Sequence, residues 1–468
     1  MRGIPGASPA CLAWVIWVNW VFMRLSCLAA ALLLLVVGGV ACIAGPPDAD
    51  HFAATARRAG LRVLEGEHLV LVTDRPVREG DGVDELPRVF DAAFAVWCRH
   101  FGIDPAAHRE WRALACLMTD RERFQAAGLL PTGGAIPDFA NGYCLGARFW
   151  MMDQSSPAYR RHLLLHEGVH AFTLTLRDAA APVWYTEGIA EHLATHRLDH
   201  GADGSARFIP TPIPLEAGDV EQLGRIEKIR TLRSARASPS LADVFATPPA
   251  NHHALDSYAA SWAAVALLAG HPAHADVFRG CERGPLDGSF TKRLEAAPGW
   301  SGSQAARDFD AFTDELDYGY DFTRSAIDWS AGSPLRGTQT FNVASDRGWQ
   351  NSTWRLTAGQ RCSLRATGRI QVGQASACHP SSKASACLLE SEPDGISLEW
   401  YRGRPVGRLL AAQWVEEPAG GGRPRFVVLA EGAAGEFTAA ADGPLYFKIN
   451  ESPGRLADNA GTFTVDLQ

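Results

Sequence analysis

The 468-residue sequence has no CxxC pair, no surplus of basic residues, and no convincing internal repeat or low-complexity tract. The missing CxxC pairs argue against a zinc site built from cysteine thiolates. Forty-four basic residues against 52 acidic ones give a formal net charge of −8. This argues against sequence-independent binding of nucleic acid, which needs an excess of Lys and Arg. The 47% hydrophobic and 21% charged residues instead predict a globular protein with a packed core.

The first 45 residues hold much of the apolar content. Residues 3–23 and 25–45 carry no charged side chain, and each run is about long enough to cross a bilayer as a helix. The second run follows Met23 and Arg24, a short basic start that is typical of a secretory signal. Residues 1–45 are therefore a signal peptide, with Met23 as the true start, or a retained membrane anchor.

A lipobox-like stretch ends at Cys42, although Gly39 stands where an aliphatic residue is usual. Lipidation of Cys42 is thus a further alternative, and in each case we expect an exported bacterial protein that is periplasmic, on the cell surface or anchored in the membrane. Seven cysteines lie beyond this leader, and the odd number leaves at least one thiol unpaired unless it bridges to another chain. Cys378 and Cys387 are close enough in sequence to form a disulfide.

The rest of the chain predicts two unlike domains. Hydrophobic periodicity predicts strands at 68–74, 111–118 and 147–153, helices at 87–101, 157–175, 187–197, 221–232, 257–270 and 305–317, a loop at 131–141 and irregular chain at 198–220. From Trp349 on, alternating polarity predicts strands at 361–370, 396–400, 426–430, 445–449 and 462–467. We place the domain boundary between Asp328 and Gly348, so that the domains span residues 48–330 and 345–468.

Residues 166–170 read His-Glu-Gly-Val-His. Positions i and i+4 of a helix share a face, so His166 and His170 can direct their imidazole nitrogens at one zinc ion with Glu167 beside the attacking water. Apolar residues on both sides of the motif predict a helix packed in a core, where the charged Glu needs a partner such as a metal. The third His of metzincins is absent, because Leu176 stands at its position.

About 16 residues beyond this motif lies Trp-Tyr-Thr-Glu-Gly-Ile-Ala-Glu, which ends at Glu191. HExxH followed by WxxEGxAE resembles the gluzincins of the peptidase MA clan, and residues 60–330 resemble peptidase-like domains of exported bacterial proteins. The resemblance implies an α+β domain with a small mixed sheet and active-site helices. It also implies that Glu187 is the third zinc ligand and that Glu191 orients a liganding histidine.

The same resemblance extends to a loop with Gly133, Gly134 and Pro137, and to residues 149–153, which would form the sheet edge on which peptide substrates lie. It implies that Tyr258 donates a hydrogen bond to the oxyanion, and a core aromatic beside Trp262 is the alternative.

Several other polar residues are expected to lie outside the set of metal ligands. We expect His162 and His192 to be solvated or to lie in the layer around the metal. The pair His252-His253 is expected in an exposed loop, and the charge cluster at 225–236 on a solvated helix face.

The implied function is that of a zinc metallopeptidase acting on a peptide or protein substrate. Zinc would lower the pKa of its bound water and polarise the scissile carbonyl. Glu167 would take the proton of this water and pass it to the leaving amine.

Residues 345–468 resemble the galactophilic lectins of the LecA type, which are small calcium-binding β-sandwiches. The resemblance rests on residues 348–350, 359–368, 392–395 and 446–463, the last of which reads Tyr-Phe-Lys-Ile-Asn-Glu-Ser-Pro-Gly-Arg-Leu-Ala-Asp-Asn-Ala-Gly-Thr-Phe. It implies an all-β domain, with a glycan as the candidate ligand.

In such lectins the last of these segments holds Ca²⁺, and the corresponding residues here are Glu451, Asp458 and Asn459, all with oxygen ligands. The sequence departs from the lectins in having Glu rather than Asp at 451 and Asp rather than Asn at 458. Arg455 also stands where the lectins have a ligating hydroxyl. The alternative for this domain is a sandwich that serves as a spacer or as a protein-contact module.

A rival to the peptidase is a surface protein that binds carbohydrate or protein through the sandwich and whose zinc domain is structural or catalytically lapsed. We favour the enzyme, because His166, His170, Glu187 and the general base Glu167 are all present.

Overall fold

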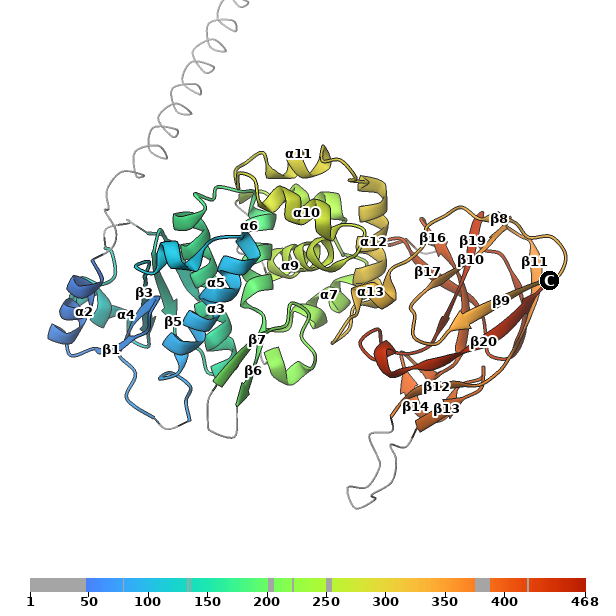
Figure 1. Ribbon diagram of the computed structural model, residues 1–468, viewed down its shortest axis with the longest axis horizontal. Helices are drawn as coiled ribbons and strands as arrows, with labels where there is room; N and C mark the ends of the chain where they lie inside the picture. The colour runs from blue at the N-terminus through green and yellow to red at the C-terminus, as the bar shows by residue number, and fades with distance from the viewer. Residues whose placement is uncertain are drawn as a thin grey trace, which may run out of the picture. The chain divides into compact units, whose positions relative to one another are not determined.

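The computed structural model describes residues 48–468, apart from 79, 133, 135, 201–205, 221–222, 250–254, 375–387 and 419–420. The predictions for the leader with Cys42, for Gly133, for His252-His253 and for the pairing of Cys378 with Cys387 lie outside the described residues. Ala49–Gln468 forms one compact unit, which is mixed α+β and becomes rich in strands toward its C-terminus (Figure 1). Within the described ranges, no helix has the length and apolar character that crossing a membrane requires.

Helices and a small sheet make up the chain as far as Ser325. The elements are α2 (Ala49–Arg58), β1 (Arg62–Glu65), β2 (Leu69–Thr73), α3 (Leu86–Phe101), η1 (Pro105–His108), β3 (Ala113–Met118), α4 (Arg121–Ala126), β4 (Gly142–Leu145), β5 (Arg148–Met152), α5 (Pro157–Leu176), α6 (Val183–Ala194), β6 (His196–His200), β7 (Ala206–Pro210), η2 (Ala217–Val220), α7 (Arg225–Ser234), α8 (Leu241–Phe245), α9 (Leu255–Gly270), α10 (Ala275–Glu282), α11 (Phe290–Glu295), α12 (Gly302–Glu315) and α13 (Phe322–Ser325).

The first sheet has the strand order β1-β2-β3-β5-β4. Its three inner strands are parallel, whereas β1 and β4 pair antiparallel at the two edges. Both faces are covered, so β2 and β3 are buried throughout and β5 is buried except at its two ends. Alternate side chains of β3, such as Ala115 and Cys116, enter different cores, one shared with α3 and α5 and the other with α2 and α4.

The sequence prediction that residues 149–153 form the substrate-binding edge is wrong. β5 lies between β3 and β4, and the edge strand is β4. The turn at Gly146, where φ is +60°, reverses the chain so that β5 pairs antiparallel with β4. The strand Gly142–Leu145 was missed in the sequence because four residues carry too little periodicity to be recognised.

Residues 198–220 were expected to be irregular, but they contain most of a hairpin in which β6 pairs antiparallel with β7. Most predicted helices are confirmed with small shifts of their ends, among them α3, α5, α9 and α12.

Two glycines allow the central helices to pack closely. A Cβ atom on Gly168 of α5 would lie 2.5 Å from the ring of Phe90, and one on Gly188 of α6 would lie 2.5 Å from the carbonyl oxygen of Ser261 on α9. The absence of side chains at these positions brings α5 against α3 and α6 against α9. This packing fixes the two helices that carry the HExxH and EGxAE motifs.

The C-terminal strands form two large sheets and a separate two-stranded sheet of β14 and β15. They are β8 (Ser333–Pro334), β9 (Gln339–Ala344), β10 (Gln350–Leu356), β11 (Arg361–Thr367), β12 (Ile370–Gln374), β13 (Leu388–Ser391), β14 (Ile396–Tyr401), β15 (Arg404–Val406), β16 (Leu409–Val415), β17 (Arg425–Glu431), β18 (Ala434–Thr438), β19 (Gly443–Ile449) and β20 (Ala460–Leu467), with η4 (Leu456–Asp458) before the last strand.

One large sheet has the order β17-β16-β19-β10-β8, and the other has β13-β12-β20-β11-β18 with β9 beside β20. Side chains of both sheets, such as Phe447 and Phe463, share one hydrophobic core, which makes this part a β-sandwich. The predicted division into domains 48–330 and 345–468 stays a prediction, since Ala49–Gln468 is one unit.

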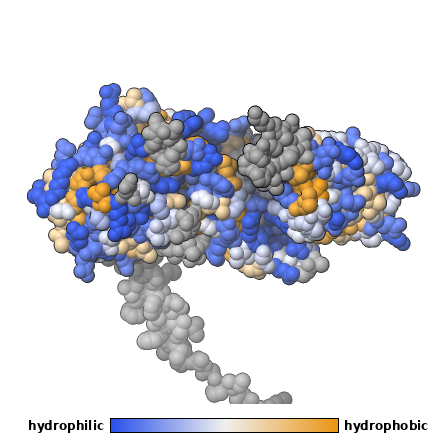
Figure 2. Space-filling model, turned by 90° about the horizontal axis from the view of Figure 1, so that it is seen from below, coloured by the Kyte–Doolittle hydropathy of each residue, from blue (hydrophilic) through white to orange (hydrophobic). Residues whose placement is uncertain are grey.

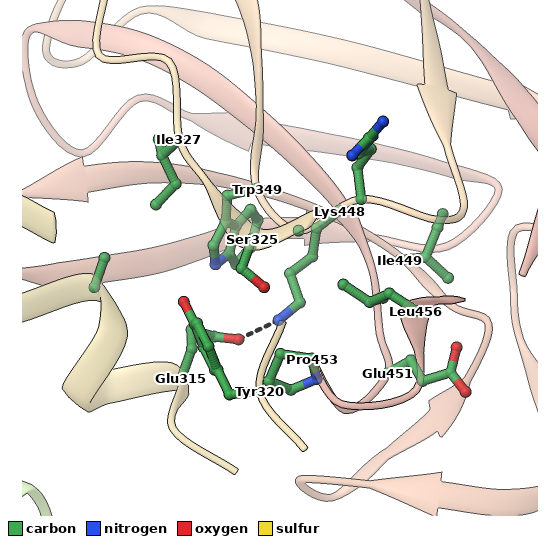
Figure 3. A pocket seen from close by; sticks show the side chains of 13 residues that line it. Glu315, Tyr320, Ser325, Ile327, Trp349, Lys448, Ile449, Glu451, Pro453 and Leu456 are labelled. Atoms are coloured by element: carbon green, nitrogen blue, oxygen red, sulfur yellow. Dashed lines mark hydrogen bonds and ion pairs between the residues drawn. The ribbon is translucent and has the colours of Figure 1, made fainter. Parts of the chain in front are cut away.

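Residues of α12 and of β19 meet in the pocket drawn in Figure 3. Lys448 of β19 forms an ion pair with Glu315 at the end of α12, and its Nζ lies 5.2 Å from the ring centroid of Trp349. Both charged side chains are largely buried, so each needs the other's charge, although Glu315 also pairs with Arg402 over 3.4 Å.

The face seen in Figure 2 is mostly hydrophilic, with hydrophobic residues in small patches. Leu398 and Trp400, which are 88% and 61% exposed, are the most exposed large hydrophobic residues of β14.

Candidate metal centre

Two nitrogen atoms and one oxygen atom lie close together between α5 and α6. His166 and His170 of α5 place their Nε2 atoms 3.1 Å apart, and Oε2 of Glu187 lies 3.3 Å from the first and 3.4 Å from the second. A tetrahedral zinc with ligands at about 2.0–2.1 Å requires ligand-to-ligand distances of about 3.3 Å. The three side chains that were expected to be ligands therefore lie close enough together to hold a metal ion.

The surroundings of these atoms fit a cation. Oε2 of Glu187 is buried and accepts no hydrogen bond, an arrangement that is costly for a carboxylate oxygen unless it coordinates a metal. Burial alone would raise the pKa of Glu187, yet His170 and His166 hold it below its usual range. Burial alone would also lower the pKa of His166, yet Glu187 and Glu191 raise it to about 10. The site thus favours positive charge between its carboxylates.

The balance of charge points the same way. The carboxylates of Glu167, Glu187 and Glu191 gather here with one guanidinium, that of Arg225. With both histidines neutral, the form in which they bind a metal, three negative charges and one positive charge leave two uncompensated, and a divalent cation supplies that amount.

Glu191 lies behind His166 and is 2% exposed. Its Oε1 is 3.3 Å from Nδ1 of His166, and its Oε2 is 3.2 Å from Nε2 of His162. Arg225 donates to both oxygens, over 2.7 Å from Nη2 and 3.0 Å from Nε. Although burial alone would raise the pKa of Glu191, Arg225 and His162 hold it well below its usual range, so the carboxylate stays charged beside His166.

Glu167 is buried next to the edge strand β4. A Cβ atom on Gly142 would lie 2.8 Å from Cδ of Glu167, so only glycine leaves room for this carboxylate. Burial raises the pKa of Glu167, and His166 opposes that rise. A base with a raised pKa at the sheet edge suits proton transfer to and from a substrate at that edge.

Tyr258, in the first turn of α9, lies with its ring centroid 5.9 Å from that of His166. Burial and the carboxylate of Glu187 raise its pKa well above the usual value, so the phenol keeps its proton and can donate it in a hydrogen bond. The structure thus places the ring of Tyr258 beside His166, and its role as a hydrogen-bond donor to the oxyanion stays a prediction.

Sequence reasoning missed Arg225. The cluster at 225–236 was expected to be a solvated face, but the side chain of Arg225 is 10% exposed and lies on Glu191. A basic residue in the first turn of a helix opposes the helix dipole, and this was the available signal. His162 and His192 are both buried rather than solvated.

Two other clusters of histidine and acid residues exist in the described part of the chain. That of His162, His166 and Glu191 already holds the guanidinium of Arg225. In the cluster of His271, His274 and Asp308, the acid accepts hydrogen bonds from His274 over 2.8 Å and from Trp329 over 2.7 Å. Only the group of His166, His170 and Glu187 lacks such a partner for its acid oxygen, among the residues described.

The predicted calcium residues lie together after β19. Asn459 donates from Nδ2 to Oε2 of Glu451 over 2.7 Å and to the carbonyl of Ser345 over 2.9 Å. Oε1 of Glu451 is buried without a hydrogen bond, and Nε of Arg455 lies 3.5 Å from it. Asp458 is exposed.

No known protein-family model matches this chain, and no curated protein matches it. Among solved structures, the chain is similar to one described as "EclA N-terminal domain; PllA-like lectin", at 21% identity and a TM-score of 0.18. The match covers 27% of this chain and 92% of that one.

Proposed function

We propose that this protein is an exported zinc-dependent metallopeptidase of the gluzincin type. The observation that carries the proposal is the triangle of His166, His170 and Glu187, whose donor atoms are spaced for tetrahedral zinc around a buried oxygen that accepts no hydrogen bond. When bound, zinc activates water for attack and polarises the scissile carbonyl.

The chain's own residues supply the remaining steps. Glu167 takes the proton of the attacking water and delivers it to the nitrogen of the leaving amine, so the proton removed from the water ends on the product. Tyr258 keeps its phenolic proton and donates a hydrogen bond to the carbonyl oxygen as that oxygen gains negative charge.

The substrate would lie along β4. One side of this strand pairs with β5 and the other ends the sheet. An extended peptide can pair with such an edge through main-chain hydrogen bonds. Glu167 lies directly beside Gly142 of this strand, which supports cleavage at that point.

The test is metal content and peptidase activity of the wild type and of Glu167→Gln, with Glu295→Gln on the surface of α11 as the matched control. We expect one zinc per chain in all three proteins. We expect turnover of a peptide pool to fall by about 10²–10⁴-fold in Glu167→Gln alone. The proposal fails if the zinc-loaded wild type cleaves no peptide or if Glu167→Gln matches it; the former result favours the rival binding protein with a lapsed zinc domain.

A second function, calcium binding by the sandwich, is favoured by one observation. Oε1 of Glu451 is buried and accepts no hydrogen bond, although Arg455 is close enough to compete as the cation. We propose that Ca²⁺ binds with Glu451, Asp458 and Asn459 as oxygen ligands.

Calcium should then raise the melting temperature of the wild type but not that of Asp458→Ala, with Asp442→Ala, just before β19, as the control. An unchanged melting temperature of the wild type in millimolar calcium would contradict this second proposal. Arg455 would then be the only cation at the loop.

A further inference from the structure

Glu191 is a buried carboxylate that holds three basic side chains at once. Its two oxygens face His162, His166 and Arg225 at distances between 2.7 and 3.3 Å. A carboxylate so placed can rotate only if several of these contacts break together. Its orientation therefore fixes the ring of His166, whose Nδ1 it faces.

Of these three partners, only Arg225 contacts both oxygens of the carboxylate. The guanidinium is planar and donates from two nitrogens along parallel directions, so it holds the carboxylate in one plane. The same guanidinium also excludes a second metal ion from the group of His162, His166 and Glu191, because the oxygens such an ion would need are already engaged.

Arg225 also lies beside Tyr258, whose ring is next to that of His166. Its Cζ lies 5.5 Å from the ring centroid of Tyr258, within the range of a cation–π interaction, and this ring packs against His166. One guanidinium thus lies against both Glu191 and Tyr258, two residues that border the ring of His166.

The other basic residues of α7 have different partners. Lys228, Arg230 and Arg233 pair with Asp256, Asp317 and Asp310. Arg225 stands at the first position of the helix, where the dipole disfavours a positive charge. The ion pair with the Glu191 carboxylate compensates for burying this charge.

We propose that Arg225 is a positioning residue of the metal centre, which sets the orientation of His166 through Glu191 and supports Tyr258. The inference rests on the proposed zinc site and adds a residue from a third helix to it. It commits to a measurable consequence, since residues behind a metal ligand typically change metal affinity by about 10–100-fold when they are removed.

The experiment compares the full chain with its Arg225→Gln, Arg225→Lys and Arg230→Gln variants. Zinc affinity is measured by competition with a chromophoric chelator, and the geometry of the site by the visible absorption spectrum of the cobalt-substituted protein. Circular dichroism and melting temperature show whether each variant is folded. Arg230→Gln is the matched control, because it removes an ion pair of the same helix that does not face Glu191.

We expect Arg225→Gln to bind zinc about 10–100-fold more weakly and to shift the cobalt spectrum. Arg225→Lys should recover part of the affinity, because it keeps the charge but loses the planar fork. Arg230→Gln should keep the wild-type affinity even if it melts earlier. If Arg225→Gln does not fold, the zinc affinity and cobalt spectrum of Arg225→Lys decide the result.

Folded Arg225 variants with the zinc affinity and cobalt spectrum of the wild type would overturn the inference and leave the proposed function intact. A wild type that binds no zinc would overturn the proposed function, and the inference would fall with it.

Discussion

At the scale of single residues, the metal centre depends on what is absent as well as on what is present. Gly142 lies so close to Glu167 that a side chain there would occupy the space of the carboxylate. Helical spacing, which is local, predicted that His166 and His170 share a face, and the resemblance to gluzincins implied Glu187 as the third ligand. Arg225 and Gly142 lie far from the motif in sequence and reach it only through tertiary packing.

Gly142→Ala is therefore expected to displace the Glu167 carboxylate while leaving the three metal ligands in place. Misplacing a catalytic group by about 1 Å can cost about 10²-fold in rate, so kcat should fall by about that factor with zinc content unchanged. Gly443→Ala is the control, since no atom lies within 4 Å of its added Cβ. Equal turnover of Gly142→Ala and the wild type would contradict the placement of Glu167.

Two buried histidines near the centre predict sensitivity to acid. Burial lowers the pKa of His192 to about 3 and that of His196 to about 4, from 6.5 in the unfolded chain. As pH falls below 6.5, the unfolded chain binds protons that the folded chain does not, and each histidine then lowers the free energy of unfolding by about 1.4 kcal/mol per pH unit.

In His192→Gln, the free energy of unfolding should fall less steeply between roughly pH 6 and pH 4, by about 1.4 kcal/mol per pH unit. Urea unfolding at a series of pH values measures this. An identical slope in His192→Gln would contradict the account of a buried, neutral His192.

At the scale of elements, the site depends on how closely α6 approaches α9. The helices themselves followed from hydrophobic periodicity, and α5 and α9 were predicted almost to their ends. The edge strand β4 and the hairpin of β6 and β7 were not predicted. Their stability comes from pairing with strands that the local sequence does not specify. The prediction of the edge at residues 149–153 failed for this reason.

Gly188→Ala tests the close packing of α6 against α9. Its Cβ would meet the backbone of Ser261, which cannot rotate away, so we expect a loss of about 1–3 kcal/mol in the free energy of unfolding and weaker zinc binding as Glu187 shifts. Gly280→Ala in α10 has nothing within 4 Å of the new methyl group and should be neutral or stabilising by up to about 1 kcal/mol. A wild-type stability for Gly188→Ala would refute the close contact.

At the scale of the whole molecule, the unit Ala49–Gln468 contains a buried ion pair between the helical part and the sandwich. The sequence showed two compositional halves, but it did not show that Lys448 and Glu315 meet, because 133 residues separate them. Burial alone would raise the pKa of Glu315, yet Lys448 and Arg402 lower it, so both charges persist in the folded state.

Lys448→Met should cost about 3–5 kcal/mol in unfolding free energy, because it leaves the Glu315 carboxylate buried without its main partner. Combining it with Glu315→Gln should cost less than the sum of the two single changes. Arg361→Met removes an ion pair whose side chains are 84% and 80% exposed and should cost at most about 1 kcal/mol. Strictly additive effects of Lys448→Met and Glu315→Gln would show that the buried pair does not form.

The central claim, a zinc ion held by His166, His170 and Glu187, is tested most directly by anomalous diffraction at the zinc edge from crystals of the zinc-loaded protein. The account predicts one peak about 2.0–2.1 Å from Nε2 of both histidines and from the Glu187 carboxylate. A peak at Glu191 or at the cluster of His271, His274 and Asp308, or no peak between α5 and α6, would contradict it.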